Sequence, residues 1–247
     1  MKNILSSILF YFFPISLTYV ILNVLGHKIN KTAKVGFSFI WKTKIILDKE
    51  SHIGHFNIIY ITSLKIGERG LIRNRNIFFG DFKAVLKDSA RIGNQNRFSR
   101  SNSDKVVIGQ STLYLGVLAC ITKKASIDLT SNVTIGNYSQ IAGIGTQIWT
   151  HGYVHAKSGP DRFRVDGAVK IGTNVYIGSG CLINPGVEIA ETINVGGNCT
   201  ISKSLTTAGM YVSQPLRHLP KNYQSIKDSL IEVKKEGLIE KVFEKKI

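Results

Sequence analysis

The segment TQIWTHGYVH, residues 146–155, carries the side chains best suited to chemistry. His151 and His155 lie four residues apart, and Trp149 stands beside them. A neutral imidazole can take a proton from a substrate hydroxyl near pH 7, so either histidine is a candidate general base. Two solvated loop histidines are the alternative interpretation. No cysteine lies in the segment, so a covalent acyl-enzyme is not expected.

Other roles in this region follow from residue type. Asp161 and Asp166 are close enough in the sequence to orient a histidine, but each also suits a turn or an ion pair, and the orienting carboxylate stays unassigned. Trp149 either forms a wall of an acceptor site or packs the segment onto the rest of the protein. A metal site is not expected, because histidines four residues apart suit metal binding on a helix and this segment is predicted to be a loop.

A six-residue repeat predicts the scaffold that positions these side chains. Aliphatic residues occupy every sixth position from Ile171 to Ile201. A helix would scatter them around its surface, whereas a chain that turns a corner every six residues points each of them inward. Three faces make a coil of 18 residues, which predicts a parallel β-solenoid with Cys181 stacked on Cys199. An antiparallel β-sandwich with coincidental spacing is the alternative.

The repeat is interrupted over residues 147–168, which contain three Gly and one Pro. We expect an excursion loop that leaves the solenoid here, and long loops on rigid scaffolds tend to carry function. Ile135 and Ile171 are 36 positions apart, the length of two 18-residue coils, so the interruption need not shift the register.

The repeat resembles that of the hexapeptide-repeat acyltransferases, which are left-handed parallel β-helices, most specifically over residues 129–217. Among them, the galactoside and maltose O-acetyltransferases have a similar line, in which an Ile-Gly to Ile-Ala repeat leads into a loop with His just after Thr. Here Ile135-Gly136, Ile141-Ala142 and Thr150-His151 follow in that order. The resemblance implies that His151 is the general base, with His155 the second choice. Gly152 stands where those enzymes commonly have Pro, so we expect the acceptor pocket rather than the base to differ.

The same resemblance, which extends to polysaccharide-biosynthesis acetyltransferases, implies a function. It implies transfer of acetyl from acetyl-CoA to a sugar hydroxyl of a surface polysaccharide or its lipid-linked precursor, without a metal. It also implies a homotrimer with each active site between subunits, and Trp149 as an acceptor-binding residue. The implied donor contacts, in which small residues admit the pantetheine and cations meet the phosphates, are Ser179, Gly197, Ser202, Lys203 and Arg217.

Two rival functions stay open. The first is an N-acetyltransferase of an amino sugar or a small metabolite; serine acetyltransferases carry Asp-Arg-His-Pro where this sequence reads Asp-Arg-Phe-Arg at residues 161–164, which argues against that subgroup. The second is a non-catalytic solenoid that binds a glycan or an acidic lipid through its basic N-terminal coils.

The N-terminal segment, residues 4–25, contains no charged residue and is followed by Lys28, Lys31 and Lys34. At about 1.5 Å per residue it is long enough to cross a bilayer core, but Pro14 breaks a continuous helix. We expect a helix or helical hairpin in the membrane interface; a span, or a helix packed on the protein's own core, are the alternatives. The lysines favour a protein on the cytoplasmic face of the inner membrane, peripheral or anchored through residues 4–25.

The net charge of +16 is uneven, because +11 of it lies in residues 1–100. This distribution fits attraction to anionic headgroups better than binding to nucleic acid. After Pro215 an apolar stripe at helical spacing predicts a C-terminal amphipathic helix that covers the end of the solenoid. The predicted organisation is a membrane-associating segment (1–30), an all-β parallel left-handed β-helix (31–210) and a helical cap (211–247).

Overall fold

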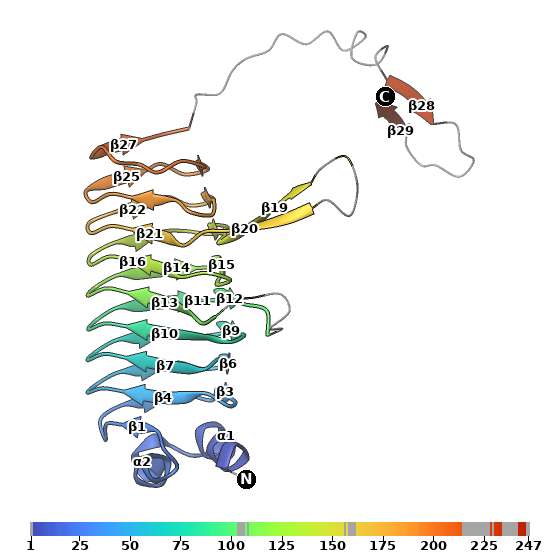
Figure 1. Ribbon diagram of the computed structural model, residues 1–247. Coiled ribbons are helices and arrows are strands. Elements are labelled where there is room, and N and C mark those ends of the chain that lie inside the picture. Colours follow the sequence, from blue (N-terminus) through green and yellow to red (C-terminus); the bar gives the residue numbers. More distant parts are fainter. Residues whose placement is uncertain are drawn as a thin grey trace. The chain divides into compact units, whose positions relative to one another are not determined.

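The computed structural model describes residues 2–102, 107, 109–155, 157, 162–213, 228, 230–233 and 242–245. The chain divides into two units, residues 1–213 and 214–247. The first unit begins with two short helices and continues as a solenoid whose coils stack along one axis (Figure 1). Each regular coil contributes one strand to each of three parallel sheets.

The three sheets, named A, B and C here, run the length of the solenoid. Sheet A contains β1 (Lys28–Ile29), β4 (Lys44–Leu47), β7 (Ser63–Ile66), β10 (Phe82–Leu86), β13 (Ser111–Leu115), β16 (Val133–Ile135), β21 (Val169–Ile171) and β24 (Glu188–Ile189). Sheet B contains β2 (Lys34–Val35), β5 (His52–Ile53), β8 (Leu71–Ile72), β11 (Arg91–Asn94), β14 (Cys120–Lys123), β17 (Gln140–Ile141), β22 (Tyr176–Ile177), β25 (Ile193–Val195) and β27 (Gly209–Tyr211). Sheet C contains β3 (Phe39–Ile40), β6 (Ile58–Tyr60), β9 (Ile77–Phe79), β12 (Arg97–Ser99), β15 (Ser126–Asp128), β18 (Gln147–Ile148), β23 (Leu182–Ile183) and β26 (Thr200–Ile201).

The repeat residues form the core, as the sequence predicts. Every sixth-position aliphatic residue from Ile171 to Ile201 is buried. Cys181 and Cys199 are buried on neighbouring coils, since Leu182 pairs with Thr200. Cys120 differs from the expectation of a core position: it is partly exposed, because Ile121 rather than Cys120 is the inward residue of β14.

The interruption of the repeat is a β-hairpin, and it is shorter than the predicted loop. Residues 147–149 stay with the coil, and the hairpin consists of β19 (His151–His155) and β20 (Arg162–Asp166), paired antiparallel (Figure 1). Ile135 pairs directly with Ile171, so the 36 positions between them are one coil plus the inserted hairpin, not two coils. The register is kept, because the chain returns to the coil where it left: the Gly167 N–H donates to the Thr150 carbonyl at 2.9 Å.

Buried asparagines stabilise one corner of the N-terminal coils. Asn57, Asn76 and Asn96 stack on successive coils between sheets B and C, and each Oδ1 accepts the backbone N–H of the next residue in the stack, at 2.9 Å. In this way Asn96 Oδ1 bonds to the Ala125 N–H one coil further on. Coils here have corner residues in the left-handed region, such as Phe56 and Arg75, which explains why the six-residue frame slips before residue 128.

The N-terminal segment is a helical hairpin, α1 (Lys2–Phe12) and α2 (Ile15–Val24), which breaks at Pro14. It packs on the first coil of the solenoid: α1 contacts β3, and α2 contacts β1 and β2. Leu9, Phe10, Ile15 and Leu22 join the solenoid's hydrophobic core. None of the helices in the described part of the chain has the length and hydrophobicity needed to cross a membrane.

The described residues of the second unit correct the predicted C-terminal helix. They form an antiparallel pair, β28 (Leu230–Val233) and β29 (Val242–Lys245), in which Leu230 lies opposite Lys245. The stripe that suggested a helix is rich in β-branched and aromatic residues, which favour strands. Ile226 and Leu238, the other members of that stripe, lie outside the described residues.

Candidate active site

The candidate site is centred on a carboxylate–imidazole pair at the base of the β19–β20 hairpin. His151 Nδ1 lies 2.9 Å from Asp128 Oδ2. Asp128 ends β15 in sheet C, and His151 follows β18, the next strand of the same sheet, at the point where the hairpin leaves the coil. The stacking of coils therefore brings together two residues that are 23 positions apart in the sequence.

Two threonines surround the Asp128 carboxylate with donors. Thr150 donates its backbone N–H to Oδ2 at 2.9 Å and its hydroxyl to the same oxygen at 2.5 Å. Thr130 donates its hydroxyl to Oδ1 at 2.9 Å. Burial by itself raises the pKa of Asp128, but the hydrogen bonds from Thr150 and His151 outweigh it, so the pKa lies below its ordinary value. Asp128 is thus an anion held in one orientation.

This arrangement sets the tautomer of His151. An ionised carboxylate only accepts hydrogen bonds, so Nδ1 carries the proton that it donates to Asp128, and Nε2 is left with a free lone pair. The His151 side chain is 27% exposed, against 10% for that of Asp128. The imidazole therefore reaches solvent while its orienting partner is covered, which is the arrangement of a general base.

Two aromatic rings flank the imidazole. Trp149 lies on one side, with ring centroids 5.9 Å apart, and Tyr153 on the other, at 6.1 Å; both contacts are edge to face. Trp149 and Tyr153 are themselves exposed. The predicted position of Trp149 beside His151 is confirmed, and Tyr153 is a second wall that the sequence analysis did not single out.

The other candidates in the hairpin lie elsewhere. His155 lies at the far end of β19, and four residues of extended strand place it about 13 Å from His151, too far to share the carboxylate or a metal ion. Asp166 is on β20, where it accepts from Arg164 at 2.7 Å. Asp161 lies outside the described residues. No group of His, Cys, Asp or Glu that could hold a metal is present among the residues that the structure describes.

Asp128 is the functional residue that the sequence analysis missed. Ile127 pairs with Ile148, 21 positions later, because the coil between them has three residues more than the 18-residue repeat. Counting in sixes therefore could not align Asp128 with His151. The one signal was a carboxylate beside an inward-facing position of the coil that precedes the interruption.

The predicted donor contacts fall into two groups at opposite edges of sheet C. Ser179 and Gly197 stack on neighbouring coils at the corner between sheets B and C, where Asn198 N–H donates to the Ser179 carbonyl at 2.8 Å. Ser202 and Lys203 follow β26 at the other edge, the edge that carries His151, and line a groove at the end of the solenoid. All four are exposed. Arg217 lies outside the described residues.

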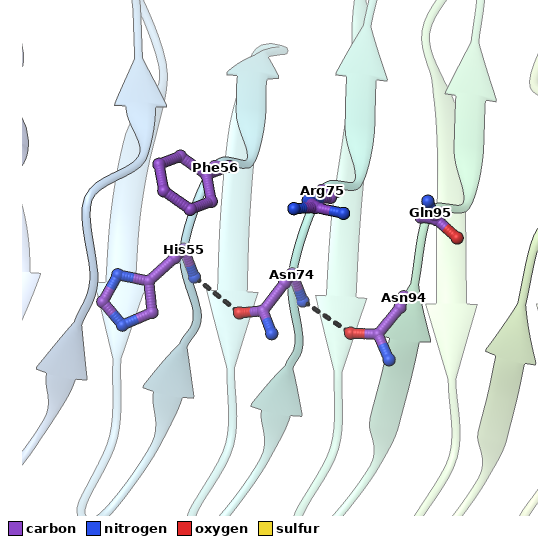
Figure 2. A pocket seen from close by; sticks show the side chains of 6 residues that line it. All are labelled: His55, Phe56, Asn74, Arg75, Asn94 and Gln95. Atoms are coloured by element: carbon purple, nitrogen blue, oxygen red, sulfur yellow. Dashed lines mark hydrogen bonds between the residues drawn. The ribbon is translucent and has the colours of Figure 1, made fainter.

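A surface groove near the N-terminal coils is separate from this site. Figure 2 shows His55, Asn74 and Asn94 stacked along it, with Phe56, Arg75 and Gln95 beside them. The His55 N–H donates to Asn74 Oδ1 at 2.8 Å, and the Asn74 N–H to Asn94 Oδ1 at 3.0 Å. These bonds join one coil to the next, so they account for the asparagines structurally. The groove lies on the edge of sheet C opposite to His151.

Comparison with solved structures agrees with this fold. No protein-family model matches the sequence, and no curated protein matches it either. The polysialic acid O-acetyltransferase OatWY is similar over 82% of this chain and 91% of its own, at 15% identity, with a TM-score of 0.50. The polysialic acid-specific acetyltransferase NeuO (16% identity, 69% of this chain, 83% of its own) and Bacillus cereus AntD, an N-acyltransferase in complex with dTDP and 3-hydroxybutyryl-CoA (16%, 85%, 91%), both have TM-scores of 0.39.

The likeness to OatWY shows the fold: this chain is a left-handed parallel β-helix. The predicted fold class is confirmed for the solenoid, including the handedness that rested on resemblance alone.

Proposed function

We propose that the protein is an acyl-CoA-dependent O-acetyltransferase, which moves acetyl from acetyl-CoA to a hydroxyl of a surface-polysaccharide sugar or its lipid-linked precursor. The observation that carries the proposal is the Asp128–His151 pair, with Nε2 free at the base of an inserted hairpin. A non-catalytic binding module has no need of a buried carboxylate that fixes an exposed imidazole. The likeness of the fold to an O-acetyltransferase supports the same reading.

In the proposed reaction His151 acts twice. Nε2 takes the proton of the acceptor hydroxyl as its oxygen attacks the thioester carbonyl carbon. Asp128 stabilises the imidazolium that forms, through the Nδ1–H bond. When the tetrahedral intermediate collapses, the C–S bond breaks and the imidazolium returns its proton to the leaving thiolate. The products are an acetyl ester and CoA, and the imidazole is neutral again.

The acceptor sugar lies between Trp149 and Tyr153 in this proposal. Both rings are exposed and stand on either side of the imidazole. Aromatic faces pack well against the apolar faces of sugar rings and leave their hydroxyls free to meet polar groups. This would hold one hydroxyl near Nε2.

For the donor, the geometry favours Ser202 and Lys203 over the other predicted contacts. They share an edge of sheet C with His151, and Ser202 stands two strand steps, about 10 Å, beyond the Trp149 position. Lys203 is then placed to meet a phosphate of CoA. Ser179 and Gly197 lie at the opposite edge, so they contact a donor bound next to a neighbouring subunit. Arg217 keeps its predicted role as a proposal from resemblance.

A homotrimer fits one further feature. Sheet C presents exposed apolar side chains on its first three coils, at Phe39, Ile58 and Phe79. The outward column that contains Tyr60 and Phe79 continues through Ser99 to Asp128. A second copy packed on this face would stand beside the active site. Light scattering of the purified protein tests this: a mass of three chains is expected, and a monomer under conditions that support activity would contradict it.

The experiment that tests the function measures acetyl transfer from acetyl-CoA to a panel of polysaccharide repeat units by mass spectrometry. We expect a gain of acetyl that mild alkali removes, because an ester hydrolyses under conditions that leave an amide intact. An alkali-stable product would favour an N-acetyltransferase. Failure of the protein to bind acetyl-CoA at all would favour a non-catalytic module.

A further inference from the structure

We propose that the outer face of the α1–α2 hairpin is a docking surface for an anionic lipid bilayer, and that the solenoid stands on the membrane with its active site held away from it. The docking does not depend on the catalytic proposal. Only the consequence for the acceptor, given below, rests on the proposed function.

The hairpin is inverted in its polarity. On α1 the side facing the solenoid includes Ser6 and Ser7, which are buried. The Ser7 hydroxyl donates to the Ile40 carbonyl at 2.5 Å, and Ser6 Oγ lies 3.0 Å from His27 Nε2. On α2 Thr18 is buried as well. These polar groups are satisfied by the helices and the solenoid, so the hairpin is built to cover the open end of the first coil.

The opposite side of the hairpin is apolar and exposed. It includes Leu17 and Val24, which are 73% and 80% exposed, and Phe12, which is 65% exposed. The other large exposed apolar side chains of the hairpin are Ile4, Leu5, Ile8, Tyr11, Phe13, Val20 and Ile21. Isolated surface leucines need no explanation, but ten such residues on two adjoining helices form a patch that favours a lipid or protein partner over water.

Basic residues border this patch. Lys31 and Lys34 line a groove together with Pro14, Ile15 and Ser16 at the start of α2. Lys28, Lys42, Lys44 and Lys49 are also exposed on the first coil, and residues 1–50 carry a net charge of +5. An apolar surface rimmed by lysines matches the acyl boundary and the phosphates of an anionic bilayer.

The same charges argue against a second copy of the chain as the occupant. Two copies joined end to end through their hairpins would bring two lysine-rich rims of equal sign together, which is unfavourable. In a cyclic trimer the three hairpins lie at one level along the symmetry axis. They would then engage one membrane together and gain from multivalency.

The placement of the active site follows from the stacking. The hairpin covers the end of the solenoid next to β3, and His151 follows β18, which is five strand steps along sheet C (Figure 1). At roughly 4.8 Å per step this is about 24 Å. Given the proposed function, the sugar that is acetylated lies several residues away from the lipid anchor, so the acceptor is an oligosaccharide or polymer rather than the sugar joined to the lipid phosphate.

Vesicle flotation of the full-length protein tests the docking. We expect it to float with phosphatidylcholine vesicles that contain phosphatidylglycerol and to float much less with phosphatidylcholine alone. L17D/V24D should abolish flotation, whereas M210D, at a residue 76% exposed on β27 at the far end of the solenoid, should retain it. Lys31→Gln with Lys34→Gln should weaken binding about 25-fold, at about fivefold per lysine.

Three results would overturn the proposal: no flotation with either vesicle, equal flotation with both, or a lipid-free dimer of assemblies that L17D/V24D dissociates. The last would identify a second copy as the occupant. Acetyl transfer to a soluble acceptor should be unchanged in L17D/V24D. Loss of flotation with transfer intact therefore separates the docking from the proposed function.

Energy transfer to dansyl-labelled lipid tests the height of the active site, because the protein has two tryptophans, Trp41 just after β3 and Trp149 just after β18. With W149F, which keeps Trp41, we expect strong transfer. With W41F, which keeps Trp149, we expect transfer several times weaker. Equal transfer from the two would mean that the solenoid lies flat on the membrane and would overturn the proposed orientation.

Discussion

Asp128 and His151 lie in neighbouring coils of one sheet, with Oδ2 of the aspartate 2.9 Å from Nδ1 of the histidine. Asp128 is covered and anchored by two threonines, whereas the imidazole reaches solvent between two aromatic rings. The rigid part of the site thus belongs to the solenoid, and the exposed part belongs to the start of the hairpin. A solenoid can fix a base in this way because its coils stack in register.

Asp128→Asn should lower kcat by roughly 10²–10⁴-fold. The amide nitrogen of Asn can donate to Nδ1, which favours the wrong imidazole tautomer, and the amide cannot stabilise an imidazolium as a carboxylate does. The shape is conserved, so circular dichroism and the KM for acetyl-CoA should stay near those of the original protein. An Asn variant with full kcat would mean that the pair is structural.

Trp149→Ala and Tyr153→Ala should each raise the KM for the acceptor about three- to tenfold, the worth of one aromatic packing contact. The KM for acetyl-CoA should change little, because neither ring is on the proposed donor groove. Tyr153→Phe keeps the ring and is the matched control. Steady-state kinetics with each substrate varied in turn will distinguish the two sites, and a rise confined to acetyl-CoA would place the donor between the rings instead.

Asn76→Ala should destabilise the solenoid by about 2–4 kcal/mol, because it leaves buried donors and acceptors of Asn57 and Asn96 without partners. Asn74→Ala is the control one corner position away: its side chain is exposed and accepts one backbone N–H, so a cost below about 1 kcal/mol is expected. Urea unfolding followed by circular dichroism measures both. Equal losses would show that the buried ladder has no special role.

The stability of the N-terminal coils should fall as the pH drops below 6.5, the ordinary pKa of histidine. Burial lowers the pKa of His27, and burial together with Lys34 and His55 lowers that of His52. The unfolded chain therefore binds protons in this range before the folded chain does, which favours unfolding as the pH falls; above 6.5 both states are neutral and the stability is fully present. Thermal unfolding measured across this range should show the slope, and H27Q/H52Q should remove most of it.

How much of this was predictable can be judged from particular residues. The run from Ile171 to Ile201 predicted the solenoid because the coils there have 18 residues and each sixth side chain is inward. Earlier coils have extra corner residues such as Phe56, so their register depends on backbone conformations that a repeat count does not contain. Asp128 was missed for that reason. The C-terminal stripe fitted a helix by spacing alone, whereas its described residues pair as strands.

His151 was predicted from the order of Thr150 and His151 after the repeat, and the structure adds its partner. Its role stays a proposal, as do the membrane association and the homotrimer. The two donor groups could not be separated from the sequence, because which edge of a sheet a corner occupies depends on the coil closing around its core.

The most direct test of the central claim is the kcat for acetyl transfer of His151→Ala beside His155→Ala, under the same saturating acetyl-CoA and acceptor. Both histidines lie on β19, but only His151 bonds to a buried carboxylate. We predict that His151→Ala lowers kcat by roughly 10²–10⁴-fold, while His155→Ala keeps it within about twofold. A His151→Ala protein that transfers acetyl at the original rate would contradict the account.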